Sequence, residues 1–402
     1  MGLFQQHNRL LLDPLIRYCS RKYLSEKLVK PSYDIFKTTR RNVSSNGEWS
    51  DDEIRKMRLM KRVGAGMLFS ATLGLAIYSK RSKAQRLRDC LEDCERLPPD
   101  PDYTSSMGSE FYRCKSCIFP GDIIKSGTLK KLESLELKRN DVIVASFPKS
   151  GTTWMQEIVY LIQTGLDFEG AQKQVLESRF PYLEHPYPGL SAIKKTEGPR
   201  LIKTHLPLSL LPKSALENGT KVIYIVRNPK DVAVSYYYFL RMATFVGYRG
   251  GLNDFINKFI KGEVPYGPYF EHVLGYWKQH QSNPNYGSNL LWITYEEMHR
   301  DPEGSIRRVA HFLDRPLTDD QVRLIAAHTR FDSMARNPSV NYSHWDDLGL
   351  RNKNEAPFMR NGRVGDWRSY FDGNTNRRFD DFISQHLESS GLKFDFIPAD
   401  EK

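Results

Sequence analysis

Four short apolar runs, rich in β-branched residues, are spread along the chain from its middle onward. They lie at 142–145, 201–202, 222–226 and 289–298. Stretches with helical spacing separate them, because apolar residues recur three or four positions apart. Uninterrupted runs of this kind are typical of parallel strands buried on both faces. The sequence therefore predicts an α/β domain, a P-loop-like three-layer fold with a central, mostly parallel sheet.

The first run is followed by a loop that has the character of an anion site. Residues 146–151 read SFPKSG, and helical spacing begins at Thr152. A strand, a tight loop and a helix start aim backbone N–H groups and the positive end of the helix dipole at an anion. Lys149 adds a full charge, and Ser150 and Thr153 add hydroxyl groups. We expect this loop to bind a phosphate.

Two other strand ends carry side chains suited to catalysis and to phosphate binding. His205 follows the second run, two residues after Lys203. Open α/β sheets place functional groups at the carboxyl ends of their strands, and an imidazole can take a proton near neutral pH. Arg227 ends the third run, and Ser235 lies two turns into the helix predicted after it. A guanidinium fork suits a dianionic phosphate.

These segments together resemble the cytosolic sulfotransferases. The loop FPKSGTTW is similar to the family's YPKSGTTW, and PRLIKTHLP contains the family's catalytic-histidine segment KTHLP. The segment KVIYIVRNPKDVAVS resembles its 3′-phosphate site, and RNGRVGDW its RKGxxGDW motif. The resemblance covers about 107–398. The loop does not match the G-x-x-x-x-G-K-[ST] pattern of nucleotide kinases, although an ATP-dependent kinase with a degenerate loop is an alternative.

The resemblance implies a sulfotransferase that moves a sulfuryl group from 3′-phosphoadenosine 5′-phosphosulfate (PAPS) to a hydroxyl or amine of a small acceptor such as a phenol, steroid or alcohol, without a metal. It implies that His205 is the base, that Lys149 and Lys203 stabilise negative charge, and that Ser235 assists catalysis. The cofactor-binding residues carried over are Lys149, Ser150, Gly151, Thr152, Thr153, Trp154, Arg227, Ser235, Tyr295, Thr329, Phe331, Arg360, Asn361 and Gly362.

Three positions depart from the family pattern. Asn361 replaces a lysine of the 3′-phosphate motif, which is expected to weaken cofactor affinity without abolishing it. Arg330 replaces the usual serine beside Thr329 and Phe331. Residues 368–377 lack the family's K-x3-TV-x3-E dimer motif, so dimerisation through it is in doubt. A non-catalytic cofactor-binding relative, tethered to a membrane as a scaffold, is a second alternative, and Asn361 is its only support.

The N-terminal part of the chain precedes the family resemblance and divides into three segments. Residues 1–62 are basic at first, with a composition typical of a mitochondrial transit peptide or of a disordered tail. Residues 63–78 carry no charge and are flanked by lysine and arginine, which favours a membrane anchor over a buried helix. Residues 79–106 are expected to form a charged helix up to Arg96 and then a proline-rich linker, with the domain at 107–398.

All five cysteines, at positions 19, 90, 94, 114 and 117, precede the phosphate loop. The core is therefore expected to have no disulfide framework, which favours a reducing compartment. The pairs Cys90/Cys94 and Cys114/Cys117 have a loose zinc-like spacing, and free thiols are the preferred interpretation.

The net charge of +11 and the pI near 9.2 indicate anionic partners, and charge alone does not choose among nucleotide, membrane and nucleic acid. With the motifs considered, we predict no nucleic-acid partner. The catalytic domain is predicted to be cytoplasmic, with a membrane anchor or mitochondrial targeting as additions. A Golgi-type enzyme is a less favoured alternative, suggested by three glycosylation sequons at Asn42, Asn218 and Asn341.

Overall fold

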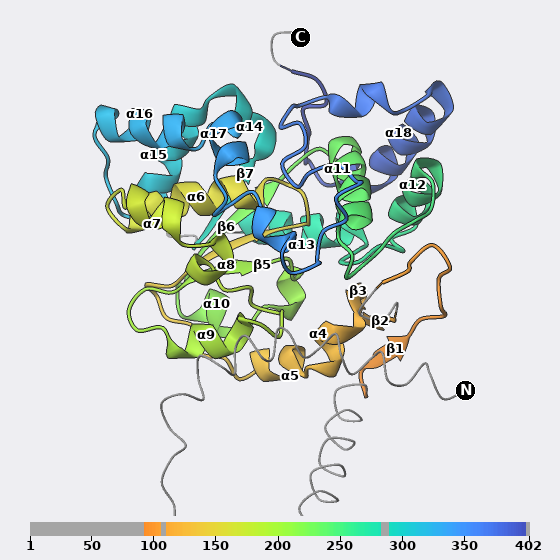
Figure 1. The fold of residues 1–402 in the computed structure, drawn as a ribbon, viewed down its shortest axis with the longest axis horizontal. Coiled ribbons are helices and arrows are strands. Elements are labelled where there is room, and N and C mark those ends of the chain that lie inside the picture. Colours follow the sequence, from red (N-terminus) through yellow and green to blue (C-terminus); the bar gives the residue numbers. More distant parts are fainter. Residues whose placement is uncertain (1–91, 106–109, 283–288, 399–402) are drawn as a thin grey trace, which may run out of the picture. The chain divides into compact units, whose positions relative to one another are not determined.

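Four parallel strands form the central sheet that the apolar runs predict (Figure 1). A computed structural model of the chain describes residues 92–105, 110–282 and 289–398. In the sheet the strands follow the order β5-β4-β6-β7. Their bounds are Val142–Ser146 for β4, Leu201–Thr204 for β5, Lys221–Val226 for β6 and Leu290–Thr294 for β7. The predicted three-layer α/β fold is confirmed.

Alternate side chains of the sheet enter two separate hydrophobic cores. Val144 and Ile223 pack on one face with α6 and α15, while Ile143 and Tyr224 pack on the other face with α11 and α13. All four of these side chains are fully buried. Because successive side chains of a strand point to opposite faces, a strand covered on both sides needs apolar residues at every position. That requirement explains the uninterrupted apolar runs of the sequence.

Strand β4 lies between β5 and β6, so the connection from β4 to β5 runs one way along the sheet and the connection from β5 to β6 runs back the other way. Such a switch point opens a crevice outside the carboxyl ends of the strands. The residues that follow β4, β5 and β6 therefore meet at one edge of the sheet. These are the phosphate loop, the segment around His205 and the segment around Arg227.

The helices cover both faces of the sheet and include those predicted after β4 and β6. The segment 121–137 contains two short helices, and the loop at 262–268 leads into a longer one. The α-helices are α4 (Gly121–Lys125), α5 (Thr128–Leu132), α6 (Thr152–Gln163), α7 (Phe168–Lys173), α8 (Leu176–Arg179), α9 (Gly189–Lys195), α10 (Ser214–Glu217), α11 (Pro229–Met242), α12 (Leu252–Ile260), α13 (Tyr269–Gln281), α14 (Tyr295–Arg300), α15 (Pro302–Phe312), α16 (Asp319–His328), α17 (Phe331–Arg336) and α18 (Gly373–Leu387), with 3-10 turns at Leu208–Leu210, Ser343–Trp345 and Asp366–Ser369.

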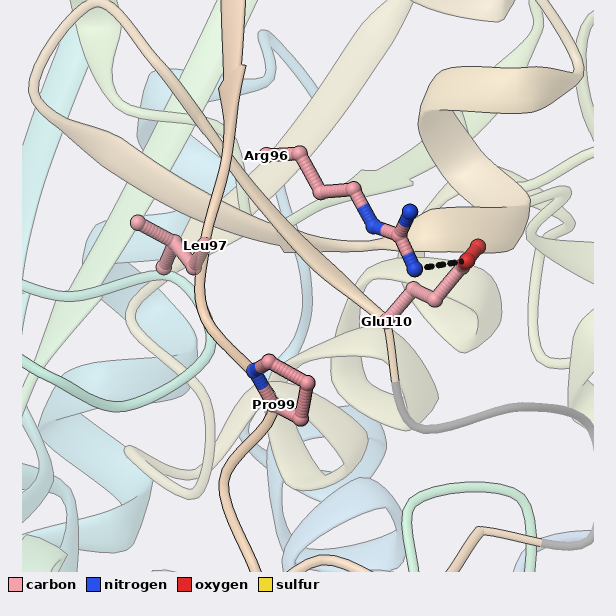
Figure 2. A pocket seen from close by; sticks show the side chains of 4 residues that line it. All are labelled: Arg96, Leu97, Pro99 and Glu110. Carbon is pink, nitrogen blue, oxygen red and sulfur yellow. Dashed lines mark hydrogen bonds and ion pairs between the residues drawn. The ribbon is translucent and has the colours of Figure 1, made fainter.

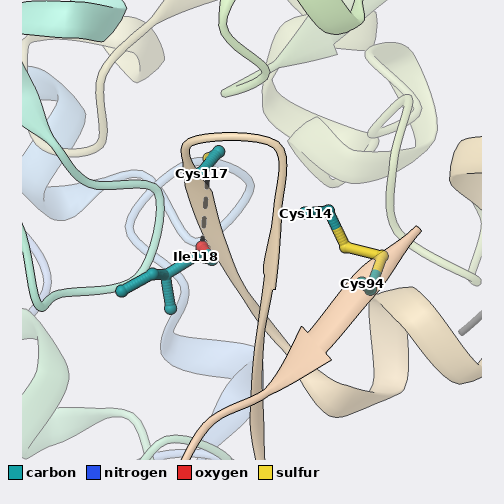
Figure 3. Close-up of a disulfide and its surroundings, with 4 residues drawn as sticks. All are labelled: Cys94, Cys114, Cys117 and Ile118. Atoms are coloured by element: carbon teal, nitrogen blue, oxygen red, sulfur yellow. Dashed lines mark hydrogen bonds between the residues drawn. A yellow bond between two sulfur atoms is a disulfide. The ribbon is translucent and has the colours of Figure 1, made fainter.

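A small antiparallel sheet precedes the main one, in the order β1-β2-β3 (Cys94–Arg96, Phe111–Cys114 and Cys117–Pro120). Cys94 and Cys114 lie opposite each other in the β1–β2 pair and form a disulfide, whereas Cys117 is a buried free thiol (Figure 3). The preference for free thiols was therefore wrong for Cys94 and Cys114. The helix expected up to Arg96 was also wrong at its end. Cys94–Arg96 form strand β1, which pairs with β2.

The proline-rich stretch after β1 packs against the domain. The side chain of Tyr103 is 5% exposed, and the backbone N–H of Thr104 donates to the carbonyl of Gly247 at 2.9 Å. A small pocket in this region is lined by Arg96, Leu97, Pro99 and Glu110, with Arg96 Nη2 donating to Glu110 at 2.6 Å (Figure 2). None of the predicted site residues lines this pocket.

The predicted basic segment and the predicted anchor at 63–78 lie outside the described residues, and the domain boundaries stay predictions. No helix in 92–105, 110–282 or 289–398 is long and apolar enough to cross a membrane. Within the same ranges, no three His, Cys, Asp or Glu side chains are grouped as metal ligands.

Candidate active site

The phosphate loop has the strand–loop–helix geometry that its sequence predicts. Lys149 and Gly151 both have positive φ, 69° and 105°, so the chain turns sharply between β4 and α6. A Cβ at position 151 would lie 2.7 Å from the ring of Tyr295, which explains the glycine. Thr152 begins α6 and its hydroxyl lies 2.6 Å from that of Ser146. The first N–H groups of α6 are thus directed toward the loop.

Cationic side chains gather around Lys149. Its ammonium lies 3.8 Å from the ring centroid of Phe358 and 4.9 Å from that of Phe239. Burial, and then the neighbouring charges of Lys203, Arg227 and Arg360, lower the pKa of Lys149 to about 7. Within the described residues, no carboxylate forms an ion pair with Lys149 or Lys203. A site that concentrates cations in this way is suited to an anion.

His205 follows β5 and is buried beside the phosphate loop. Its Nδ1 lies 2.7 Å from the carbonyl oxygen of Ser146, and a carbonyl only accepts, so Nδ1 carries the proton. For Nε2, the described part of the chain offers no hydrogen-bond partner. Burial, and then the charge of Lys203, lower the pKa of His205 well below its usual value. The imidazole is therefore neutral, with a free lone pair on Nε2.

Arg227 follows β6 and contacts both the C-terminal loop and the aromatic ring of Tyr295. Its Nη2 donates to the carbonyl of Arg363 at 2.7 Å, and its guanidinium lies 4.3 Å from the Tyr295 ring centroid. Trp154, on α6, meets the same ring edge-on at 5.7 Å. The structure thus brings together Trp154, Tyr295 and Arg227, three of the residues that the family resemblance assigned to cofactor binding.

The C-terminal loop brings the remaining predicted residues toward Arg227. Arg360 and Asn361 both donate to the carboxylate of Asp366, so the Asn361 amide already has a partner. Gly362 has φ 69°, and a Cβ there would lie 2.2 Å from the ring of Phe331. Gly362 and Phe331 are therefore in direct contact, as expected for neighbours in one binding site.

Two predicted site residues, Thr329 and Ser235, form no described contact with the other predicted site residues. Thr329 is buried and its hydroxyl donates to the Ile325 carbonyl at 2.9 Å, within the last turn of α16. Ser235 is partly exposed on α11, and among the described contacts none joins it to another predicted site residue.

Buried polar atoms without partners test whether these residues fit an anionic nucleotide. Among the described residues, four such atoms belong to predicted cofactor-binding residues: Ser150 Oγ, Trp154 Nε1, Arg227 Nε and Arg360 Nε. All four can donate a hydrogen bond. Buried donors are rarely left unpaired, because each costs about 1–3 kcal/mol. A bound molecule rich in acceptor oxygens would satisfy them, so the residues fit PAPS.

Sequence reasoning missed several side chains that complete the site. Phe239 and Phe358 enclose the Lys149 ammonium, and Tyr182 lies 4.4 Å from the Lys203 ammonium. Phe239 could have been found, since it lies four residues after Ser235 on the same helix face. Tyr266 packs edge-on to the His205 ring at 5.6 Å. The loops at 181–190 and 262–268 therefore both contribute an aromatic ring beside His205.

Comparisons with known proteins agree with this geometry. A family model described as the sulfotransferase domain matches residues 139–391. Over 270 residues the chain is 38% identical to mouse sulfotransferase 1B1, covering 66% of this chain and 88% of the mouse protein. Over 267 residues it is 39% identical to bovine sulfotransferase 1E1, covering 65% of this chain and 88% of the bovine protein.

Solved structures give the same assignment. Retinol dehydratase in complex with retinol and PAP superposes with a TM-score of 0.67 at 27% identity, covering 75% of this chain and 98% of that one. Mouse sulfotransferase SULT7A1 complexed with PAP gives a TM-score of 0.56 at 28% identity, covering 70% and 95%. The family model spans more than half of the chain, and the relatives are matched along most of their length. The chain therefore belongs to the sulfotransferase family.

Proposed function

We propose that this sulfotransferase transfers the sulfuryl group of PAPS to a hydroxyl or amine of a small, largely apolar acceptor, with His205 as general base. One observation carries the proposal. The neutral imidazole of His205, with a free Nε2, lies beside cationic side chains. Two of them, Lys149 and Lys203, form no ion pair with a carboxylate within the described residues. A base next to an anion site is what sulfuryl transfer to a hydroxyl requires.

In the proposed reaction, His205 Nε2 takes the acceptor proton as the acceptor oxygen bonds to sulfur. The bond from sulfur to the bridging phosphate oxygen breaks, and 3′-phosphoadenosine 5′-phosphate leaves. Negative charge grows on the bridging and sulfuryl oxygens, where Lys149 and Lys203 stabilise it. Ser235 is proposed to assist from α11.

We propose the roles in cofactor binding that the family resemblance implies, and the same geometry supports them. Thr152, Thr153 and the loop N–H groups bind the 5′-phosphate. Arg227, Arg360 and the turn at Gly362 bind the 3′-phosphate, and the rings of Trp154, Tyr295 and Phe331 pack on adenine. Ser150 and Asn361 are proposed as further hydrogen-bond donors, and Thr329 as a buried support for the adenine pocket.

The aromatic rings beside His205 support a flat or elongated apolar acceptor. Tyr182 lies edge-on to the His205 ring at 5.3 Å, and its hydroxyl lies 3.3 Å from that of Tyr266. Retinol and androsterone are the molecules bound in two solved relatives, both named retinol dehydratase. We therefore propose phenols, steroids and other apolar alcohols as the first acceptors to test.

Two measurements test the function. Calorimetric titration should show tight binding of 3′,5′-adenosine bisphosphate and weak binding of ATP, since ATP lacks the 3′-phosphate. Incubation with radiolabelled PAPS and a panel of phenols, steroids, alcohols and amines should give a labelled product. Preference for ATP would support the kinase alternative. Bisphosphate binding without turnover on the whole panel would support the non-catalytic scaffold.

A further inference from the structure

A fully buried carboxylate, that of Glu184, lies behind His205. Its Oε1 accepts the backbone N–H of His205 at 2.8 Å, and its Oε2 accepts the hydroxyl of Thr204 at 2.8 Å. The Thr204 hydroxyl oxygen in turn accepts the backbone N–H of Leu206 at 3.0 Å. One side chain thus fixes, directly or through Thr204, the turn that leaves β5.

The carbonyl oxygen and the ring of His205 have hydrogen-bond partners other than Glu184. Its carbonyl oxygen accepts a hydrogen bond from His272 Nε2 at 2.9 Å, and its ring is fixed on the Ser146 carbonyl. His272 is oriented by the hydroxyl of Tyr224, 2.9 Å from Nδ1. Because the N–H, the C=O and the ring of His205 all have partners, its Nε2 is aimed in one direction. Glu184 is the acceptor for the backbone N–H of His205.

Glu184 also acts on Lys203 through its charge. Burial lowers the pKa of Lys203 and the carboxylates of Glu177 and Glu184 oppose this decrease, with a net pKa of about 8. Glu177 makes no bond to the turn; it accepts from His344 Nε2 and Trp345 Nε1, each at 3.2 Å.

Five titratable groups face the Glu184 carboxylate. Burial raises the pKa of Glu184 to about 7, while its hydrogen bonds from His205 and Thr204 and the ammonium of Lys203 oppose this increase. Glu184 is therefore charged at the alkaline pH values where Lys203 titrates. Burial first, and the charge of Glu184 in addition, raise the pKa of four buried neighbours, which stay neutral at pH 7. Those neighbours are Cys117, Tyr182, Tyr266 and Tyr276.

We propose that Glu184 is a positioning residue for sulfuryl transfer, which orients His205 by accepting its backbone N–H and by fixing the Thr204 hydroxyl. The inference rests on the proposed roles of His205 and Lys203. It predicts two separable effects of removing the carboxylate. Loss of orientation lowers kcat at every pH, and loss of charge moves the alkaline limb of the kcat profile to lower pH.

Glu184→Gln preserves the size of the side chain, removes its charge and replaces one of its two acceptor oxygens by an NH2 donor, so it cannot accept both the His205 N–H and the Thr204 hydroxyl. Glu177→Gln is the matched control. For Glu184→Gln we expect kcat at its pH optimum to fall about 10-fold or more, since a misplaced group loses up to about 100-fold. Bisphosphate affinity at pH 6.5 should stay within about twofold of wild type, as Glu184 bonds only to the turn around His205. For Glu177→Gln we expect an unchanged optimum kcat, with only the alkaline limb displaced.

The inference is overturned if Glu184→Gln retains the wild-type kcat optimum, if both variants lose it equally, or if Glu184→Gln loses bisphosphate binding. The pKa of Lys203 can also be read without turnover, from the pH dependence of its acetylation measured by mass spectrometry. A lower pKa in Glu184→Gln supports the charge effect, and an unchanged value contradicts it. An inactive wild-type enzyme would refute the proposed function and leave this labelling result to decide the inference.

Discussion

His205 Nδ1 donates to the carbonyl oxygen of Ser146 at 2.7 Å, across the ends of the adjacent parallel strands β5 and β4. This bond fixes the tautomer, so the lone pair is on Nε2. Because burial and the charge of Lys203 depress the pKa of His205, the ring is neutral near pH 7. The pairing of two strands therefore sets both the direction and the protonation state of the proposed base.

His205→Ala is expected to lower kcat by about 100-fold to 10,000-fold, the range ascribed to a general base. Its affinity for 3′,5′-adenosine bisphosphate should change little, because the phosphate-binding residues come from other segments. Steady-state kinetics and calorimetry measure the two effects. The control is His311→Ala, at an exposed position on α15, which should keep wild-type turnover. Loss of bisphosphate binding in His205→Ala would contradict the role of His205 as base.

Cofactor binding is expected to take up a proton at pH 8. The pKa of Lys149 in the free protein is about 7, below its usual 10.5, so its amine is mostly neutral at that pH. A bound phosphate favours the ammonium form and raises this pKa. Uptake should approach about one proton, and affinity should fall as the pH rises above 7. Calorimetry of bisphosphate binding in two buffers of different ionisation enthalpy measures the uptake.

The matched variant for this linkage is Lys149→Met, which keeps the length of the side chain and cannot be protonated. It should lose most of the proton uptake at pH 8. If uptake in Lys149→Met equals that of wild type, another group is the one that titrates.

Gly362→Ala is expected to weaken bisphosphate binding at least about 10-fold. Its Cβ would collide with the ring of Phe331, at 2.2 Å, in a backbone conformation with φ 69°. The control is Gly349→Ala, where φ is 66° and no atom lies within 4 Å of the added Cβ. Both variants should lose about 1 kcal/mol of stability from the positive φ, and only Gly362→Ala should also lose affinity. Equal affinities would show that the contact with Phe331 does not shape the site.

The sequence predicted the parts of the site that depend on short stretches of chain. The β4–loop–α6 unit could be predicted because a strand period, a proline–glycine break and a helix period follow one another within twenty residues. Arg227 could be placed because it ends an apolar run. Glu184 could not be predicted, since its importance arises only when a loop 21 residues upstream folds over His205. Nothing in a single carboxylate between Leu183 and His185 indicates which N–H it will accept.

The N-terminal sheet was missed for a related reason. Strand β1 has only three residues, Cys94–Arg96, and they continue a charged stretch of helical character. Pairing with β2, which comes 15 residues later, overrides that local preference. The same pairing places Cys94 opposite Cys114, a contact that the spacing of the cysteines does not reveal.

Removing the disulfide should destabilise the domain locally. Cys94 and Cys114 are 20 residues apart, and closing a loop of this length contributes about 3 kcal/mol by restricting the unfolded chain. We expect Cys94→Ala/Cys114→Ala to unfold at lower urea concentration than oxidised wild type. Adding a reductant should destabilise wild type by the same amount and leave the double variant unchanged, because the buried thiol of Cys117 remains reduced in both. Wild-type stability that does not respond to reductant would show that the two cysteines are not bonded in solution.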